Sequence, residues 1–193
     1  MIKTVKKIIS YIMVCVLFLS MCIPCEAAQT STATASDANA TTGFPQITST
    51  SAIIMDAQSG QIIYEKNSHT RQYPASITKI MTAYLAIKNG DLNSTITMSD
   101  AAVWGIDRNS SHIALDVGEE ISMSDALYAV MLMSANEAAW AIAEQVSGSL
   151  ENFVQLMNDT AQSLGCKDTH FTNANGLHDP DHYTTAYDMA LIT

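Results

Sequence analysis

The segment from residue 122 to residue 148, SMSDALYAVMLMSANEAAWAIAEQVSG, constrains the fold more than any other part of the chain. Apolar residues recur along it at helical spacing, and only a few charged side chains interrupt them. It opens with Ser122 three residues before Asp125, a pattern typical of a capping box, and it closes at Gly148. So apolar a segment predicts a helical core. The pattern leaves open whether it forms one helix or two helices that meet near Ser134.

Shorter patterns on either side predict a fold that mixes α and β structure. Two apolar runs in SAIIMDAQSGQIIYEKN, residues 51–67, flank a Ser-Gly turn and predict a β-hairpin. Helical spacing follows in residues 76–90 and 149–165, each closed by a glycine, and Thr185 with Asp188 begins a further helix. Because a two-stranded sheet is marginal alone and the last helix has no end signal, we expect the front part of a longer domain.

The first 44 residues are predicted to lie outside the folded domain. Residues 1–27 have the layout of a secretory signal peptide, with three lysines, an uncharged apolar run and then small residues. An uncleaved membrane anchor is the alternative, and the helix-breaking Pro24 argues against it. Residues 28–44 are small and polar, which predicts a disordered tether. We therefore expect export to a bacterial cell envelope and a partial domain over residues 45–193.

The charge of the exported part argues against nucleic acid as a partner. Three of the nine basic residues and one of the nineteen acidic residues lie in residues 1–27, so six bases face eighteen acids in the remainder. Such a balance repels phosphate backbones, and the few bases form no cluster in the sequence.

Several distinctive side chains are predicted to belong to the core. Cys166 is the one cysteine outside the signal segment, so no intramolecular disulfide can form in the exported part. Its surroundings offer no poised base, which favours a buried thiol over a nucleophile. Tyr128, Trp140 and the methionines are also interpreted as core residues.

Ser76 and Lys79 form the first candidate catalytic pair. In a helix, a spacing of three places both side chains on one face, so the amine can reach the hydroxyl. A serine hydroxyl becomes a good nucleophile only when a base removes its proton. Lysine can be that base if burial lowers its pKa, and the apolar neighbours Ile77, Ile80 and Met81 make burial plausible. The pattern Ser-x-x-Lys carries little information by itself, and a helix-start serine beside a solvated lysine is the alternative.

Ser134 and Asn136 form the second candidate set. They interrupt a long apolar stretch, where burying a hydroxyl and an amide is costly without a task. Ser134 could relay a proton to a leaving amine, and Asn136 could hold a substrate amide. The alternative is a kink between two helices in which the polar groups are locally satisfied.

Together the two motifs, in this order, resemble the active-site set of the penicillin-recognising serine enzymes. Block after block, the chain from about residue 45 onward resembles the serine D-alanyl-D-alanine carboxypeptidases among the low-molecular-mass penicillin-binding proteins. Five ordered blocks carry this resemblance: AIIMDAQSGQIIYEKN, YPASITKIMTAYLAI, VGEEISMSDALYAVMLMSANEAAWAIAE, FVQLMNDTAQSLGCKDTHFTNANGL and HYTTAYDMALI.

The resemblance implies a fold, a reaction and roles for four residues. The fold is that of the serine β-lactamases and DD-peptidases, an antiparallel sheet packed with helices plus a helical lobe, truncated here before the later strands. The reaction removes the terminal D-alanine from peptidoglycan stem peptides through an acyl-enzyme, and β-lactams acylate the same serine. Ser76 is implied as nucleophile, Lys79 as its base, Ser134 as a catalytic proton relay and Asn136 as a substrate-binding residue. No cofactor is implied.

One motif of that family is absent from the sequence. No Lys-Thr-Gly or near variant follows Ser76, and the nearest similar run is TTG at residues 41–43. In the family this strand supplies an oxyanion donor and a cation for the substrate carboxylate. Losing one oxyanion donor costs about 10² to 10³ in rate, so we expect the chain alone to be inactive or nearly so. The C-terminal segment through which members attach to membranes is also absent from the sequence.

Two other functions remain alternatives. A class A β-lactamase shares the first motif but needs a glutamate in an E-x-x-L-N loop, whereas Glu151 is followed by NFVQ. A non-catalytic, cell-wall-associated fragment is the second alternative.

The histidines of LHDPDHY suggest a metal site only superficially. His178 and His182 are four residues apart, but Pro180 between them disrupts the helix that would align them. We therefore interpret this segment as a polar loop and expect no metal.

Overall fold

A computed structural model describes residues 46–193. The predicted signal peptide, residues 1–27, and the predicted tether, residues 28–44, lie outside the described residues.

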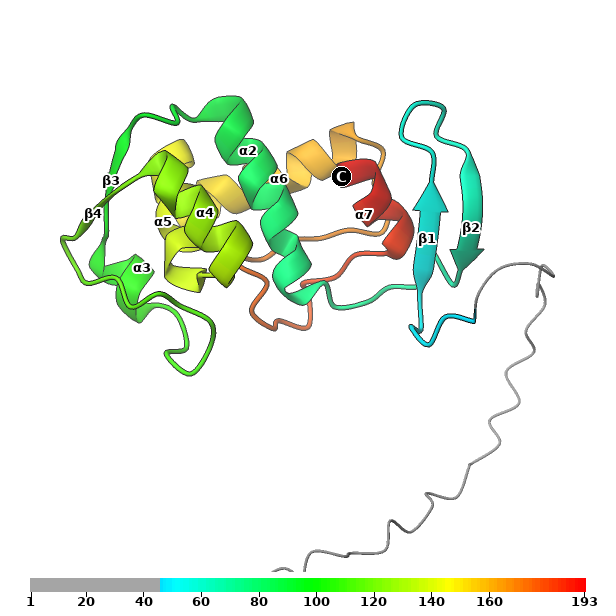
Figure 1. The fold of residues 1–193 in the computed structure, drawn as a ribbon, viewed down its shortest axis with the longest axis horizontal. Helices are drawn as coiled ribbons and strands as arrows, with labels where there is room; N and C mark the ends of the chain where they lie inside the picture. The colour runs from blue at the N-terminus through cyan, green and yellow to red at the C-terminus, as the bar shows by residue number, and fades with distance from the viewer. Residues whose placement is uncertain (1–45) are drawn as a thin grey trace, which may run out of the picture. The chain divides into compact units, whose positions relative to one another are not determined.

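The predicted hairpin is confirmed. Strand β1 (Ala52–Met55) pairs antiparallel with β2 (Ile62–Lys66), with Ile54 opposite Tyr64. In the turn, the Asp56 carboxylate accepts hydrogen bonds from the backbone N–H and the hydroxyl of Ser59, at 2.8 and 2.6 Å. Figure 1 shows this hairpin at one end of the described part, with the helices beside it.

The segment that carries the first motif begins as a 3₁₀ turn. Helix η1 (Ala75–Thr78) runs directly into α2 (Lys79–Asn89), which ends before Gly90 as predicted. Ser76 therefore lies in the tighter turn and Lys79 opens the α-helix. The change from 3₁₀ to α geometry between them still leaves the two side chains on one side of the chain.

The apolar segment that begins at residue 122 forms two helices rather than one. Helix α4 (Met123–Met133) starts at Ser122, whose hydroxyl accepts from the Asp125 N–H at 3.0 Å, which confirms the predicted cap. Helix α5 (Asn136–Ser147) follows after a two-residue break and ends at Gly148. At the break Ser134 adopts the left-handed conformation, with φ of 56°. This conformation ends α4, and α5 begins two residues later.

The remaining elements complete a mixed fold. Helix α6 (Leu150–Ser163) and helix α7 (Ala186–Ile192) occur where the sequence predicted them. The sequence missed helix α3 (Asp100–Trp104), and it missed a small antiparallel pair formed by β3 (Thr95–Thr97) and β4 (Glu120–Ser122). No helix within residues 46–193 has the length and apolar character needed to cross a bilayer.

Two hydrophobic clusters form the core. One joins α3, α4 and α5 and includes Val103, Met123 and Ile142. The other joins α2, α6 and α7 and includes Met81 and Phe153. Both clusters contain residues of α2 and α5. These two helices therefore lie at the centre of the helical part.

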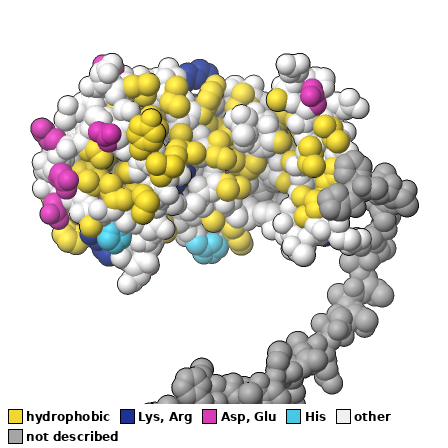
Figure 2. All heavy atoms as spheres, viewed as in Figure 1, with side chains coloured by type: hydrophobic (Ala, Val, Ile, Leu, Met, Phe, Trp, Pro, Cys, Tyr) yellow, Lys and Arg dark blue, Asp and Glu magenta, His cyan; other side chains and the backbone are white. Residues whose placement is uncertain are grey.

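The core assignment is wrong for Tyr128 and for the methionines Met131 and Met133. The Tyr128 side chain is 64% exposed, because it lies on the outer face of α4 with Met131, Leu132 and Met133. Figure 2 shows hydrophobic side chains gathered over α2 and α4 on this side of the molecule. Trp140 is partly buried against the first cluster, and Cys166 is buried as predicted.

Candidate active site

The start of η1 presents Ser76 at the surface. The residue before it, Ala75, has a φ of +49°, a left-handed conformation that is uncommon for a side chain other than glycine. Ser76 is exposed, so its hydroxyl is accessible to a substrate.

Three of the predicted residues meet at the Ser76 hydroxyl. Ser134 Oγ donates a hydrogen bond to Ser76 Oγ at 3.0 Å, across 58 residues of sequence. The buried Lys79 Nζ lies 3.5 Å from Ser76 Oγ. The structure thus brings both sequence motifs to the same oxygen atom.

The Lys79 amine is buried and surrounded by oxygen atoms. The residue is 2% exposed, and Nζ donates to Asn136 Oδ1 at 2.7 Å and to the carbonyl of Asn175 at 2.5 Å. Burial lowers the pKa of Lys79 to about 8, against the opposing field of Glu137, which raises it. The predicted burial is confirmed, but Ile77 does not supply it, since that side chain is 48% exposed.

Asn136 joins the first turn of α5 to this amine. It is 4% exposed, and its Nδ2 donates to Ser110 Oγ at 2.8 Å while Oδ1 accepts from Lys79. Both ends of the amide therefore have protein partners in this structure. The predicted role of Asn136 in holding a substrate amide stays a prediction.

The loop NANGL, residues 173–177, contributes the Asn175 carbonyl, and no role was predicted for it from the sequence. The Asn173 side chain closes this loop by accepting from the Gly176 N–H at 2.6 Å and donating to the Leu177 carbonyl at 2.9 Å. A Cβ on Gly176 would lie 1.9 Å from the carbonyl oxygen of Ala75. The loop thus contacts the backbone directly before Ser76, and only glycine permits that approach. An Asn-Gly pair after a predicted helix was the available signal.

His182 also joins the segment after α6 to η1, a role that the sequence did not predict. The segment is a loop as predicted, but His182 is 2% exposed. Its Nδ1 accepts from the Thr172 N–H at 3.0 Å, so Nε2 carries the proton and donates to Thr78 Oγ1 at 2.8 Å. Burial lowers the pKa of His182 to about 4, which keeps the ring neutral. A neutral His182 therefore links Thr172 to Thr78, one of the two residues between Ser76 and Lys79.

Comparison with known proteins identifies the family. The family model described as D-alanyl-D-alanine carboxypeptidase, peptidase S11, matches residues 36–193. The chain belongs to this family.

Relatives and solved structures of the family agree with the assignment. The D-alanyl-D-alanine carboxypeptidase DacA of Haemophilus influenzae is 43% identical over 156 residues, which cover 77% of this chain and 39% of that protein. DacF of Bacillus subtilis is 41% identical over 74% of this chain and 37% of its own length. The chain thus spans about two fifths of the length of these relatives.

Solved structures confirm the predicted fold class. Penicillin-binding protein 5 from Haemophilus influenzae matches with a TM-score of 0.72 and 40% identity, over 77% of this chain and 44% of that one. A variant of the Streptomyces K15 DD-transpeptidase matches with a TM-score of 0.72 and 29% identity, over 77% of this chain and 61% of that one. The described residues therefore have the fold of the corresponding part of the DD-peptidases.

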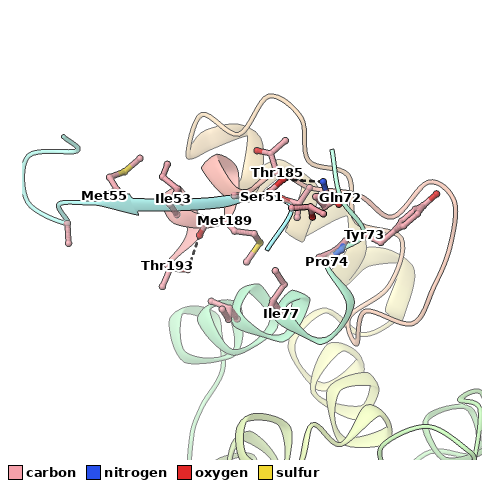
Figure 3. A pocket seen from close by; sticks show the side chains of 16 residues that line it. Ser51, Ile53, Met55, Gln72, Tyr73, Pro74, Ile77, Thr185, Met189 and Thr193 are labelled. Carbon is pink, nitrogen blue, oxygen red and sulfur yellow. Dashed lines mark hydrogen bonds between the residues drawn. The ribbon is translucent and has the colours of Figure 1, made fainter. Parts of the chain in front are cut away.

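Beside the motif of this carboxypeptidase family lies a cavity of about 680 Å³. Figure 3 shows it between β1, the segment 72–77 and α7, with Ile53, Ile77 and Met189 among the apolar side chains that face it. None of Ser76, Lys79, Ser134 and Asn136 lines it. The cavity is therefore lined by residues other than those of the reactive cluster.

The cluster has the arrangement of a nucleophile beside a base. Within residues 46–193, no group of three or more His, Cys, Asp or Glu side chains is placed to hold a metal ion. What the cluster offers is an exposed hydroxyl with a buried amine on one side and a second hydroxyl on the other.

Proposed function

We propose that this chain carries the nucleophile of a serine-type D-Ala-D-Ala carboxypeptidase that removes the terminal D-alanine from peptidoglycan stem peptides. Family membership supports the reaction class. The observation that carries the proposal is the position of Ser76 Oγ, 3.0 Å from Ser134 Oγ and 3.5 Å from Lys79 Nζ.

The contacts of Lys79 suggest how it acts as a base. A neutral amine has two protons and one lone pair. If the protons go to Asn136 Oδ1 and the Asn175 carbonyl, at 2.7 and 2.5 Å, the lone pair is left for the Ser76 hydroxyl. The lowered pKa, about 8, gives a useful neutral fraction of Lys79 near neutral pH.

The reaction then proceeds in two steps. Lys79 takes the proton of Ser76 as its oxygen attacks the substrate carbonyl, and a proton passes through Ser134 to the leaving D-alanine amine. Water hydrolyses the resulting ester and regenerates Ser76. A β-lactam acylates the same oxygen, and we propose β-lactams as covalent inhibitors.

The same proposal covers location. A signal-peptide pattern in residues 1–27 supports action outside the cytoplasm, at the bacterial cell envelope. Any attachment to a membrane is proposed to use a C-terminal segment, as in the family that the sequence resembles.

Labelled penicillin tests the function. We expect a stable covalent adduct on Ser76, found by mass spectrometry of a peptide digest, and its loss in Ser76→Ala. Ser51→Ala is a suitable control, since that hydroxyl lies outside the reactive cluster. Slow labelling is expected because the sequence lacks Lys-Thr-Gly. Rapid release of the label would indicate a β-lactamase, and no adduct after prolonged incubation would contradict the proposal.

A further inference from the structure

The loop of residues 107–113 is attached to the first turn of α5. The Asn136 N–H donates to the Ser111 carbonyl at 2.9 Å, and the Ile113 N–H donates to Glu137 Oε1 at 2.7 Å. Glu137 is fully buried, so this second bond lies in a site that excludes water. Two consecutive residues of α5 thus hold the same loop.

A third bond connects this loop to the reactive cluster. Asn136 Nδ2 donates to Ser110 Oγ at 2.8 Å, while Oδ1 of the same amide accepts from Lys79 Nζ at 2.7 Å. The Asn136 side chain therefore bridges Ser110 and Lys79.

The direction of this bridge is fixed by the Ser110 hydroxyl. Ser110 Oγ donates its single proton to the carbonyl of Asp107, so toward Asn136 it can only accept. The NH₂ end of the amide must then face Ser110, and the oxygen end must face Lys79. The hydrogen bonds run in one sense, from Lys79 through Asn136 and Ser110 to Asp107.

We propose that Ser110 is a positioning residue that orients the Asn136 amide so that its oxygen, and not its NH₂ group, faces Lys79. The inference rests on the proposed function for the use of Lys79 as base, and its geometry stands apart from that use.

Removing the Ser110 hydroxyl should change the titration of Lys79. Without it, Nδ2 of the buried amide has no acceptor in the loop, and nothing in this bridge keeps the amide from turning its NH₂ group toward the amine. Loss of an acceptor destabilises the ammonium relative to the neutral amine, so the pKa of Lys79 falls. In Ser110→Ala we expect the pKa of Lys79 to move from about 8 to about 7. Glu137, the charged group whose field reaches Lys79 among the described residues, is unchanged.

The test is a titration of the lysine side chains by ¹³C NMR in the full chain labelled with ¹³C-lysine. Comparison with Lys79→Arg assigns the Lys79 signal. The matched control is Ser111→Ala, because the Ser111 side chain is exposed and makes no hydrogen bond within residues 46–193. Ser110→Thr and Ser110→Val form a second pair that differs in the hydroxyl and keeps the branched shape. This pair decides the question if Ser110→Ala does not fold.

The proposal expects a lower Lys79 pKa in Ser110→Ala and Ser110→Val, and the wild-type value in Ser111→Ala and Ser110→Thr. An unchanged pKa in the variants without the hydroxyl overturns it, as does an equal fall in Ser111→Ala. Labelled penicillin, applied to the same proteins, separates the two proposals. If wild type forms no adduct, the proposed function fails, and the titration still decides the role of Ser110.

Discussion

At the scale of single residues, the protonation of Lys79 should control reactivity with β-lactams. Since only the neutral amine can take the Ser76 proton, acylation should rise about tenfold per pH unit and level off near pH 8. The measurement is the rate of labelling by penicillin across pH. Lys79→Arg keeps a cation but cannot become neutral, so its labelling should be lost at every pH. A flat profile would contradict the assignment of the base.

The free energy of unfolding should depend on pH through His182. Its pKa is about 4 in the fold and about 6.5 in an unfolded chain, so the stabilisation is present above pH 6.5 and is lost as pH falls toward 4. Urea unfolding at the two ends of this window should differ by roughly 3 kcal/mol at most. His182→Gln should remove this part of the pH dependence, whereas His178→Gln, at an exposed site, should retain it.

The sequence predicted the side chains of the cluster better than its backbone contacts. Ser76 and Lys79 were predicted from their spacing together with the family resemblance, and the structure places Lys79 Nζ and Ser134 Oγ beside Ser76 Oγ. The Asn175 carbonyl and the Ser110 hydroxyl were missed. A backbone carbonyl carries no signature of residue type, and Ser110 precedes its partner Asn136 by 26 positions with no repeating pattern between them.

At the scale of elements, the contact between the NANGL loop and η1 should depend on the absence of a side chain at Gly176. Gly176→Ala would place a Cβ 1.9 Å from the Ala75 carbonyl oxygen, at a φ of +84°. Gly165→Ala is the matched control, since its φ is +88° and a Cβ there meets nothing within 4 Å. We expect about 1 to 2 kcal/mol of lost stability in Gly165→Ala, from the backbone conformation alone.

Gly176→Ala should lose clearly more stability than Gly165→Ala. Its labelling by penicillin should also slow, because the segment before Ser76 must move. Thermal or urea unfolding together with labelling rates measures both effects. Equal losses of stability in the two variants would show that the close approach to Ala75 has no energetic weight.

Elements with long repeating patterns were predicted well, whereas the three-residue strands β3 and β4 and the five-residue helix α3 were missed. Helices α2, α4, α5 and α6 each bury an apolar face, which leaves a period in the sequence. Strands β3 and β4 have three residues each, too few to show alternation. The break between α4 and α5 depends on the left-handed conformation of Ser134, which serine adopts without a distinctive sequence signal.

At the scale of the whole molecule, the two hydrophobic clusters should dominate stability. Phe153 is fully buried in the second cluster, so Phe153→Ala should cost about 3 to 5 kcal/mol in urea unfolding. Ile87, on α2 but 61% exposed, is the control, and Ile87→Ala should change stability by about 0.5 kcal/mol or less. A small loss in Phe153→Ala would indicate a loosely packed second cluster.

The wrong burial prediction for Tyr128 also concerns the whole molecule. Apolar character along α4 predicts burial, but only one side of a helix can face α5. The exposed residues Tyr128, Met131 and Leu132 lie on the other side. Which side faces inward is set by neighbours that a single sequence does not reveal.

The amine at residue 79 obtains its surroundings from segments that are 57 and 96 positions further along the chain. Before those segments arrive, it is an ordinary hydrated lysine with a fully protonated head, and the neighbouring alcohol is inert. The proposed reactivity of Ser76 therefore depends on the tertiary structure and is absent from the unfolded chain. Under the proposed function, the unfolded chain should therefore not react with β-lactams.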